Sequence, residues 1–155
     1  MSVKDIVSLQ YREKVNKAAR AILHVNFPLE GWICTVRKAL NMSAAELARR
    51  LGKSRALVSN TEKAELDGGV TIKTMNNMAE AMGCRFVYAI IPEKTVEGIL
   101  EQQAQKKARK IVEKTSEHMA LEDQALSSHE LSNEVIRIQR ELLRNMPSDF
   151  WKDKG

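Results

Sequence analysis

The amino-acid sequence predicts a mainly all-α protein with one short strand after its midpoint. Apolar residues recur at helical spacing in several segments, and only one run is rich in β-branched and aromatic residues. The chain has 155 residues, which suits one small domain with a helical extension. We therefore predict four parts: an N-terminal helix with its linker at 1–28, a helical domain at 29–84, a strand at 85–92, and a helical extension at 93–155.

The first predicted helix covers residues 4–24, where apolar and basic residues alternate near helical spacing. Asn26-Phe27-Pro28 ends this segment, because the residue before a proline is disfavoured in the α conformation. A second helix is predicted from residue 32 to the turn at Asn41. We expect Trp32, Ile33, Val36 and Leu40 on its inner face, with Arg37 and Lys38 on its outer face.

Residues 43–64 carry the pattern of two short helices joined by a tight turn, as in a helix-turn-helix. Ser43 and Glu46 have the S-x-x-E spacing of a capping box. Gly52 provides the backbone freedom with which a chain leaves a helix, and Ser54 caps the next helix. The expected inward residues are Leu47, Ala48 and Leu51 in the first helix, and Leu57, Val58 and Thr61 in the second.

The second helix of this motif is polar and basic on its predicted outer face. Such side chains suit base edges and phosphates better than a core, so the pattern indicates binding of double-stranded DNA. An ordinary helical hairpin is the alternative. We expect base reading by Arg55, Ala56, Ser59 and Asn60. We expect phosphate binding by Ser43, Arg50, Lys53, Ser54, Lys63, Lys73 and Thr74.

The net charge supports a polyanionic partner. Residues 31–64 contain 7 Lys and Arg residues against 2 Asp and Glu residues, within a chain of formal charge +5. Lysine and arginine contacts release counterions from DNA, so a local excess of this kind favours nucleic-acid binding. A solvated basic face is the alternative, but the excess falls on the same residues as the motif.

Residues 71–82 predict a further helix with three inward methionines, and Lys73 and Thr74 lie at its N-terminus, where the helix dipole favours a phosphate. RFVYAII at 85–91 is the single predicted strand. A lone strand cannot pair its own backbone groups, so we expect it to pair with its copy in a homodimer. A buried helical segment is the alternative. The expected dimer residues are Phe86, Val87, Tyr88 and Ile90.

The extension at 93–155 predicts a helical hairpin or one long helix with a break at Ser127-Ser128. The first apolar stripe comprises Val96, Ile99, Leu100, Ala104, Ala108, Ile111, Thr115 and Met119, and the second comprises Leu131, Val135, Ile138, Leu142 and Met146. We favour a solvated face over a second DNA patch for the basic run at 106–110. Phe150 and Trp151 either dock on a partner or fold back onto this chain.

Residues 33–83 resemble the five-helix Xre type of helix-turn-helix, shared by phage repressors and many antitoxins. The segments GWICTVRKALNMSAAELARRLGKS (31–54), VSNTEKAELDGGVTIKTM (58–75) and MGCRFVYAIIP (82–92) are similar to the family called mobile mystery protein A. The resemblance implies a transcriptional regulator, and members of that family are usually encoded beside a Fic-domain protein. Two positions depart from the wider Xre pattern: Thr61 replaces a larger apolar residue, and Arg55-Ala56 replaces a Gln-rich helix start.

Other classes of function find little support in the sequence. No phosphate loop or hydrolase motif is present, and the three histidines fit amphipathic helices better than catalytic roles, so we expect no enzyme activity and no cofactor. Cys34 and Cys84 lack metal-ligand spacing, which predicts reduced core residues and no metal site. We expect a cytoplasmic protein without membrane contact. The inhibitory motif of some Fic antitoxins is absent, because Glu93 stands where it needs Ser or Thr before Glu97-Gly98.

Overall fold

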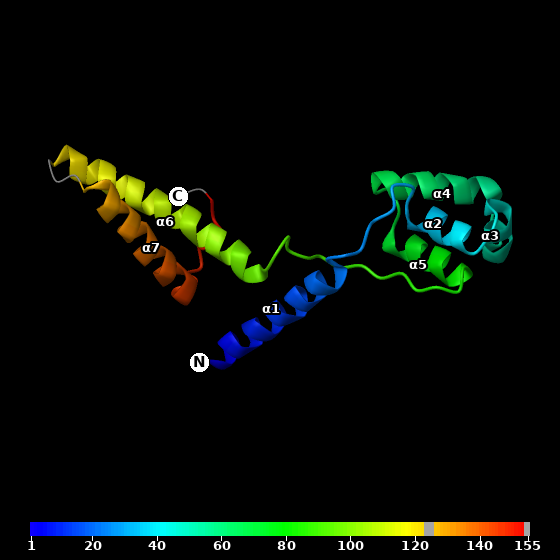
Figure 1. Cartoon of the computed structure of the whole chain (residues 1–155), viewed down its shortest axis with the longest axis horizontal. Helices are drawn as coiled ribbons and strands as arrows, with labels where there is room; N and C mark the ends of the chain where they lie inside the picture. The colour runs from blue at the N-terminus through cyan, green and yellow to red at the C-terminus, as the bar shows by residue number, and fades with distance from the viewer. Residues whose placement is uncertain (123–125, 154–155) are drawn as a thin grey trace. The chain divides into compact units, whose positions relative to one another are not determined.

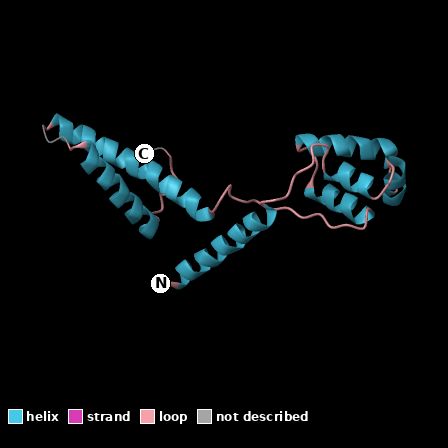
Figure 2. Cartoon of the chain, in the orientation of Figure 1, coloured by secondary structure: helices cyan, strands magenta, loops and turns pink. Residues whose placement is uncertain are grey.

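The computed structural model describes residues 1–122 and 126–153, and within them the chain forms seven α-helices and no strand (Figure 2). The helices are α1 (Val3–Ile22), α2 (Trp32–Ala39), α3 (Ala44–Leu51), α4 (Arg55–Asp67), α5 (Ile72–Ala81), α6 (Val96–Leu121) and α7 (Ser128–Asn145), labelled in Figure 1. Leu23–Ala89 form one compact unit, which we call the central unit. The second, which we call the hairpin unit, contains α1, α6 and α7.

The central unit packs α2, α3, α4 and α5 around one apolar core. Its buried residues are Ile33, Leu47, Ala48, Val58, Met75, Met78 and Met82. Every helix of the unit contributes at least one of them, and this confirms the inward faces predicted at these positions. Ala48 lies between larger neighbours, where its small side chain lets α3 approach α4 and α5.

The predicted strand at 85–91 is wrong for the single chain, because the described residues contain no strand. The Cys84 N–H still donates to the Ala79 carbonyl (2.8 Å), but no backbone hydrogen bond joins 85–91 to another described residue. The physical reason is that a strand needs a neighbour for its backbone groups. Phe86 packs against the central core, whereas Val87, Tyr88 and Ile90 are exposed, Ile90 at 94%. We call residues 85–91 the arm.

The hairpin unit confirms the predicted break, since Ser127 caps α7 through a capping box with Glu130. α6 and α7 pack against each other along a row of α6 residues spaced by four: Leu100, Ala104, Ala108 and Val112. The predicted stripe placed Ile99, Ile111 and Thr115 inward, and this is wrong because all three are exposed while Val112 continues the row. The predicted α7 residues are only half-buried, and α7 has no buried residue.

The C-terminal aromatics fold back onto this chain. Phe150 is 1% exposed and packs with Leu100 and Ala104, while Trp151 is exposed and meets the Phe150 ring edge-on. The basic run on α6 holds this tail, because Lys107 donates to the Asp149 carbonyl and Lys106 pairs with the Asp153 carboxylate (3.0 Å). Lys106 and Lys107 of the run therefore form a tail anchor, and Arg109 and Lys110 are exposed.

Asn16 connects α1 to the start of α6 inside the hairpin unit. Its Oδ1 accepts from the Val96 N–H (2.9 Å), and its Nδ2 donates to the Glu97 carboxylate (2.9 Å). Asn16 is the buried polar residue of the described chain, and both ends of its amide are satisfied. The hydrogen bond from Asn16 also lowers the pKa of Glu97. No described helix has the length and apolarity to cross a membrane.

Candidate nucleic-acid interface

The turn between α3 and α4 is built from the residues that the sequence singled out. Ser43 accepts from the Glu46 N–H (3.1 Å) and the Glu46 carboxylate accepts from the Ser43 N–H (3.4 Å), which completes the capping box. Gly52 adopts the left-handed conformation with φ of 66°. Ser54 then accepts from the Leu57 N–H (3.1 Å) and starts α4. Two caps and one left-handed glycine therefore fix the direction in which α4 leaves α3.

The exposed side of α4 carries three of the four predicted base-reading residues. Arg55, Ala56 and Asn60 are exposed, whereas Ser59 is half-buried. Among the described residues Arg55 forms no ion pair and no side-chain hydrogen bond, so its guanidinium is available for a ligand. The structure thus presents one guanidinium and one amide, the two groups that pair bidentately with purine edges.

Three residues expected to face the core are exposed, namely Trp32 and Leu40 at the two ends of α2 and Leu57 on α4. Leu57 is 38% exposed, so its predicted inward position is wrong; Val58 takes the buried site because the core lies on the side of α4 one residue further on. Thr61 is half-buried, and its hydroxyl donates to the Leu57 carbonyl (2.7 Å). That hydrogen bond within the helix lets a threonine occupy a position where a larger apolar residue is usual.

Three of the predicted phosphate-binding residues are exposed lysines. Lys53, Lys63 and Lys73 have no ion-pair partner within 1–122 and 126–153, which leaves their charges available. Arg50 is different, because its Nε donates to the Ala81 carbonyl at the end of α5 (2.6 Å). This bond holds the Arg50 side chain against α5 and still leaves its terminal nitrogens to donate.

Two of the three hydroxyl candidates for phosphate binding also serve as caps. Ser43 and Ser54 cap α3 and α4, and Thr71 caps α5 by accepting from the Thr74 N–H (3.1 Å). Thr71 in turn donates its hydroxyl to Thr74 Oγ1 (3.0 Å). The Thr74 N–H is therefore already used, and only its O–H group remains a possible donor to a phosphate.

Arg37 lies inside the central unit, so its predicted outer position is wrong. Its Nε donates to the Glu62 carboxylate (2.7 Å) and its Nη1 to the Met42 carbonyl (3.0 Å), with the Arg37 and Glu62 side chains 14% and 16% exposed. The bond to Glu62 raises the pKa of Arg37. Arg37 points inward because the half-buried Glu62 carboxylate on α4 pairs with its guanidinium. The signal in the sequence was the pair of glutamates, Glu62 and Glu65, at inward positions of α4.

The inward carboxylates matter for the charge of the interface. Glu62 is neutralised by Arg37, and Glu65 accepts hydrogen bonds from the backbone at the start of α2. Neither carboxylate is exposed. The exposed charged residues of α4 are therefore Arg55 and Lys63, together with Asp67 at the end of the helix. The result is a cationic face that attracts a polyanion.

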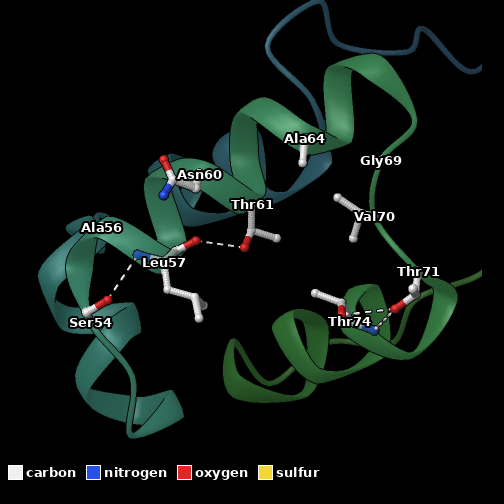
Figure 3. Close-up of a pocket in the computed structure, with 10 residues that line it drawn as sticks. All are labelled: Ser54, Ala56, Leu57, Asn60, Thr61, Ala64, Gly69, Val70, Thr71 and Thr74. Carbon is white, nitrogen blue, oxygen red and sulfur yellow. Dashed lines mark hydrogen bonds between the residues drawn. The ribbon is translucent and has the colours of Figure 1, made fainter.

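A groove of about 510 Å³ lies beside this face, between α4 and the segment that leads into α5 (Figure 3). Figure 3 shows Leu57, Thr61 and Ala64 along its α4 wall, with Val70 and Thr74 across from them. Ala56 and Asn60, two of the predicted base-reading residues, also line the groove. The groove therefore extends the exposed side of α4 towards α5.

Comparison with family models adds the deciding observation: residues 35–88 match the model of a helix-turn-helix family. Residues 35–88 form an Xre-type helix-turn-helix domain. The match spans most of the central unit and includes α3, α4 and α5. No curated protein matches this chain, and no solved structure matches it either.

The helix-turn-helix domain suggests a DNA-binding regulator. α1, α6 and α7 lie outside the matched residues, so the family match says nothing of the hairpin unit. Among the described residues, no cluster of three His, Cys, Asp or Glu side chains is arranged to hold a metal ion. Cys34 is half-buried and Cys84 exposed, so Cys84 is not a core residue in this chain.

Proposed function

We propose that this protein is a sequence-specific transcriptional regulator that inserts α4 into the major groove of DNA. The observation that carries the proposal is the outer side of α4, where Arg55, Ala56 and Asn60 are near one another in a helix-turn-helix. Glu62 and Glu65 of the same helix are turned inward. Arg55 reads a guanine edge and Asn60 an adenine edge, since these are the pairings that guanidinium and amide groups make. Lys53, Lys63 and Lys73 bind phosphates, with Arg50, Ser43, Ser54 and Thr74 as the remaining expected donors.

The proposed regulator acts as a homodimer on a two-fold-related operator and represses its own gene. The arm supports dimerisation, because Val87, Tyr88 and Ile90 are exposed and the backbone there lacks partners among the described residues. Pairing of two arms would satisfy these backbone groups and cover the apolar side chains. The sequence resemblance to the mobile mystery protein A family is compatible with a regulator of this kind.

The experiment that tests the proposal is selection of DNA from a random pool by the full-length protein, followed by sequencing and titration. We expect an enriched inverted repeat whose half-sites lie about one helical turn, or a multiple of it, apart. Affinity for it should exceed that for a scrambled site by at least about 1,000-fold at physiological salt. Equal affinity for enriched and scrambled DNA would contradict sequence-specific regulation.

A second candidate function is supported by the hairpin unit, which is compact and separate from the DNA-reading domain. Its surface exposes Ile99, Ile111 and Ile136. We propose, as the alternative, an antitoxin that binds a co-encoded Fic-domain protein through these helices. Glu97 is already bonded to Asn16, so it does not act as a free inhibitory carboxylate. Co-expression with the neighbouring gene product, compared between the wild type and Ile111→Lys, tests this binding.

A further inference from the structure

The groove beside α4 combines apolar side chains with the polar side chains of Ser54, Asn60, Thr71 and Thr74. On its α4 wall the Leu57 side chain is exposed, and Figure 3 shows it pointing into the space between α4 and the start of α5. The Thr61 hydroxyl is turned back to the Leu57 carbonyl (2.7 Å), which leaves the threonine methyl group for the groove. Ala64 and Val70 add only hydrocarbon. A ligand group that packs against Leu57, Ala64 and Val70 is therefore apolar.

The position of the groove indicates which apolar group of DNA could enter it. It borders Ala56 and Asn60 on one side, and the N-terminus of α5 on the other. When α4 lies in a major groove and Lys73 at the start of α5 meets a phosphate, the space between them faces base edges near that same strand. The one apolar group that DNA bases present in the major groove is the 5-methyl of thymine. This methyl group also projects from the edge of the thymine that is nearer to the sugar-phosphate backbone of the same strand.

We propose that Leu57 is a specificity-determining residue that packs on a thymine 5-methyl group of the operator. This inference rests on the proposed function and deepens it, since Arg55 and Asn60 read hydrogen-bonding groups while Leu57 reads hydrocarbon. Cytosine lacks the methyl group and places an amino donor nearby, which this apolar wall does not accept. Lys53 and Lys73 supply the cationic flanks that bring the strand to the groove.

The test replaces each operator thymine in turn with deoxyuridine, which removes only the methyl group. With the wild-type protein we expect binding to fall about fourfold at the thymine that Leu57 contacts, the value for a methyl-sized group removed from an apolar contact. Leu57→Ala should bind the thymine operator about that much more weakly and show no further loss with deoxyuridine. Leu66→Ala is the matched control, because Leu66 is an exposed leucine of α4 that does not line the groove.

The outcomes separate the inference from the function it rests on. The role of Leu57 is overturned if the Leu57→Ala protein keeps the full sensitivity to deoxyuridine. It is also overturned if that sensitivity is lost in Ala56→Gly but not in Leu57→Ala. Either result leaves a sequence-specific regulator. Insensitivity of the wild type at every thymine overturns it too. Absence of any enriched DNA sequence overturns the proposed function and the thymine contact together. Circular dichroism of each variant verifies that the helices remain folded. We expect Leu57→Ala to fold normally, because the Leu57 side chain is exposed.

Discussion

Glu65 on α4 caps α2 in place of a side chain on α2 itself. The Glu65 carboxylate accepts from the Trp32 N–H (2.6 Å) and the Ile33 N–H (3.0 Å). The local N-cap is Gly31, which has no side chain to offer and a φ of 87°. A Cβ atom at Gly31 would lie 3.0 Å from the Glu65 carboxylate, so the glycine makes room for a cap that comes from α4. The start of α2 and the C-terminal half of α4 are therefore fixed to each other.

This relationship predicts a stability loss when the remote cap is removed. Glu65→Ala leaves two N–H groups at the start of α2 unsatisfied, and we expect the free energy of unfolding of the central unit to fall by about 1–3 kcal/mol. Urea unfolding of the full-length protein, followed by Trp32 fluorescence in a Trp151→Phe background, measures it. Glu80→Ala is a control, because Glu80 is exposed and makes no side-chain hydrogen bond among the described residues. Equal effects of the two substitutions would contradict the capping role.

The ion pair between Arg37 and Glu62 predicts a strongly coupled pair. Arg37→Met leaves Glu62 half-buried without its cation, and we expect a loss of about 1.5–3 kcal/mol in the free energy of unfolding. Glu62→Leu strands the guanidinium and should cost a similar amount. The double variant should lose less than the sum, because neither charge is then left unpaired. Strictly additive losses in this double-mutant cycle would argue against a direct interaction.

Base reading and phosphate binding predict different signatures on DNA. Arg55→Ala should weaken specific binding by about 1–3 kcal/mol and relax the preference at one base position. Lys53→Ala should weaken all sequences to a similar extent and reduce the salt dependence by about one unit of slope. Titration against the selected operator and its single-base variants, at several salt concentrations, separates the two. An unchanged preference profile for Arg55→Ala would remove it from the base-reading set.

The arm predicts a proline-sensitive dimer. Val87→Pro removes a backbone donor and fixes φ, which a paired strand tolerates poorly. We expect sedimentation of this variant to show monomers and its operator affinity to drop. Val87→Thr keeps a β-branched side chain and the N–H, so it should remain dimeric. A Val87→Pro dimer with wild-type affinity would place the dimer interface elsewhere.

The tail anchor predicts that Phe150 stabilises the hairpin unit. Phe150→Ala removes a fully buried ring from its packing with Leu100 and Ala104, with an expected cost of about 3–5 kcal/mol. Trp151→Ala, at an exposed neighbour, should cost far less. Hydrogen exchange should then speed up in α6 and α7 while α4 amides stay protected, since the two units are separate. Faster exchange in α4 as well would show that the units unfold together.

The sequence by itself determined the parts of this fold that depend on neighbouring residues. The helix caps at Ser43 and Ser54, the glycine turn at 52 and the helix break at Ser127-Ser128 follow from interactions within a few residues, and the structure confirms them. The exposed position of Arg55, Ala56 and Asn60 follows from helical periodicity once Val58 is buried. These features depend on neighbouring residues, so they can be predicted from the sequence.

Tertiary structure alone decided the features that join distant residues. Arg37 has the spacing of an outer residue on α2, and only the approach of α4 brings Glu62 to it across 25 positions of sequence. The arm has the composition of a strand, yet a strand exists only where a second one pairs with it, and a single chain offers none among its described residues. Phe150 left two alternatives open, and the space between α6 and α7 decided that it folds back. In each case the energy comes from a partner that helical or strand periodicity does not encode.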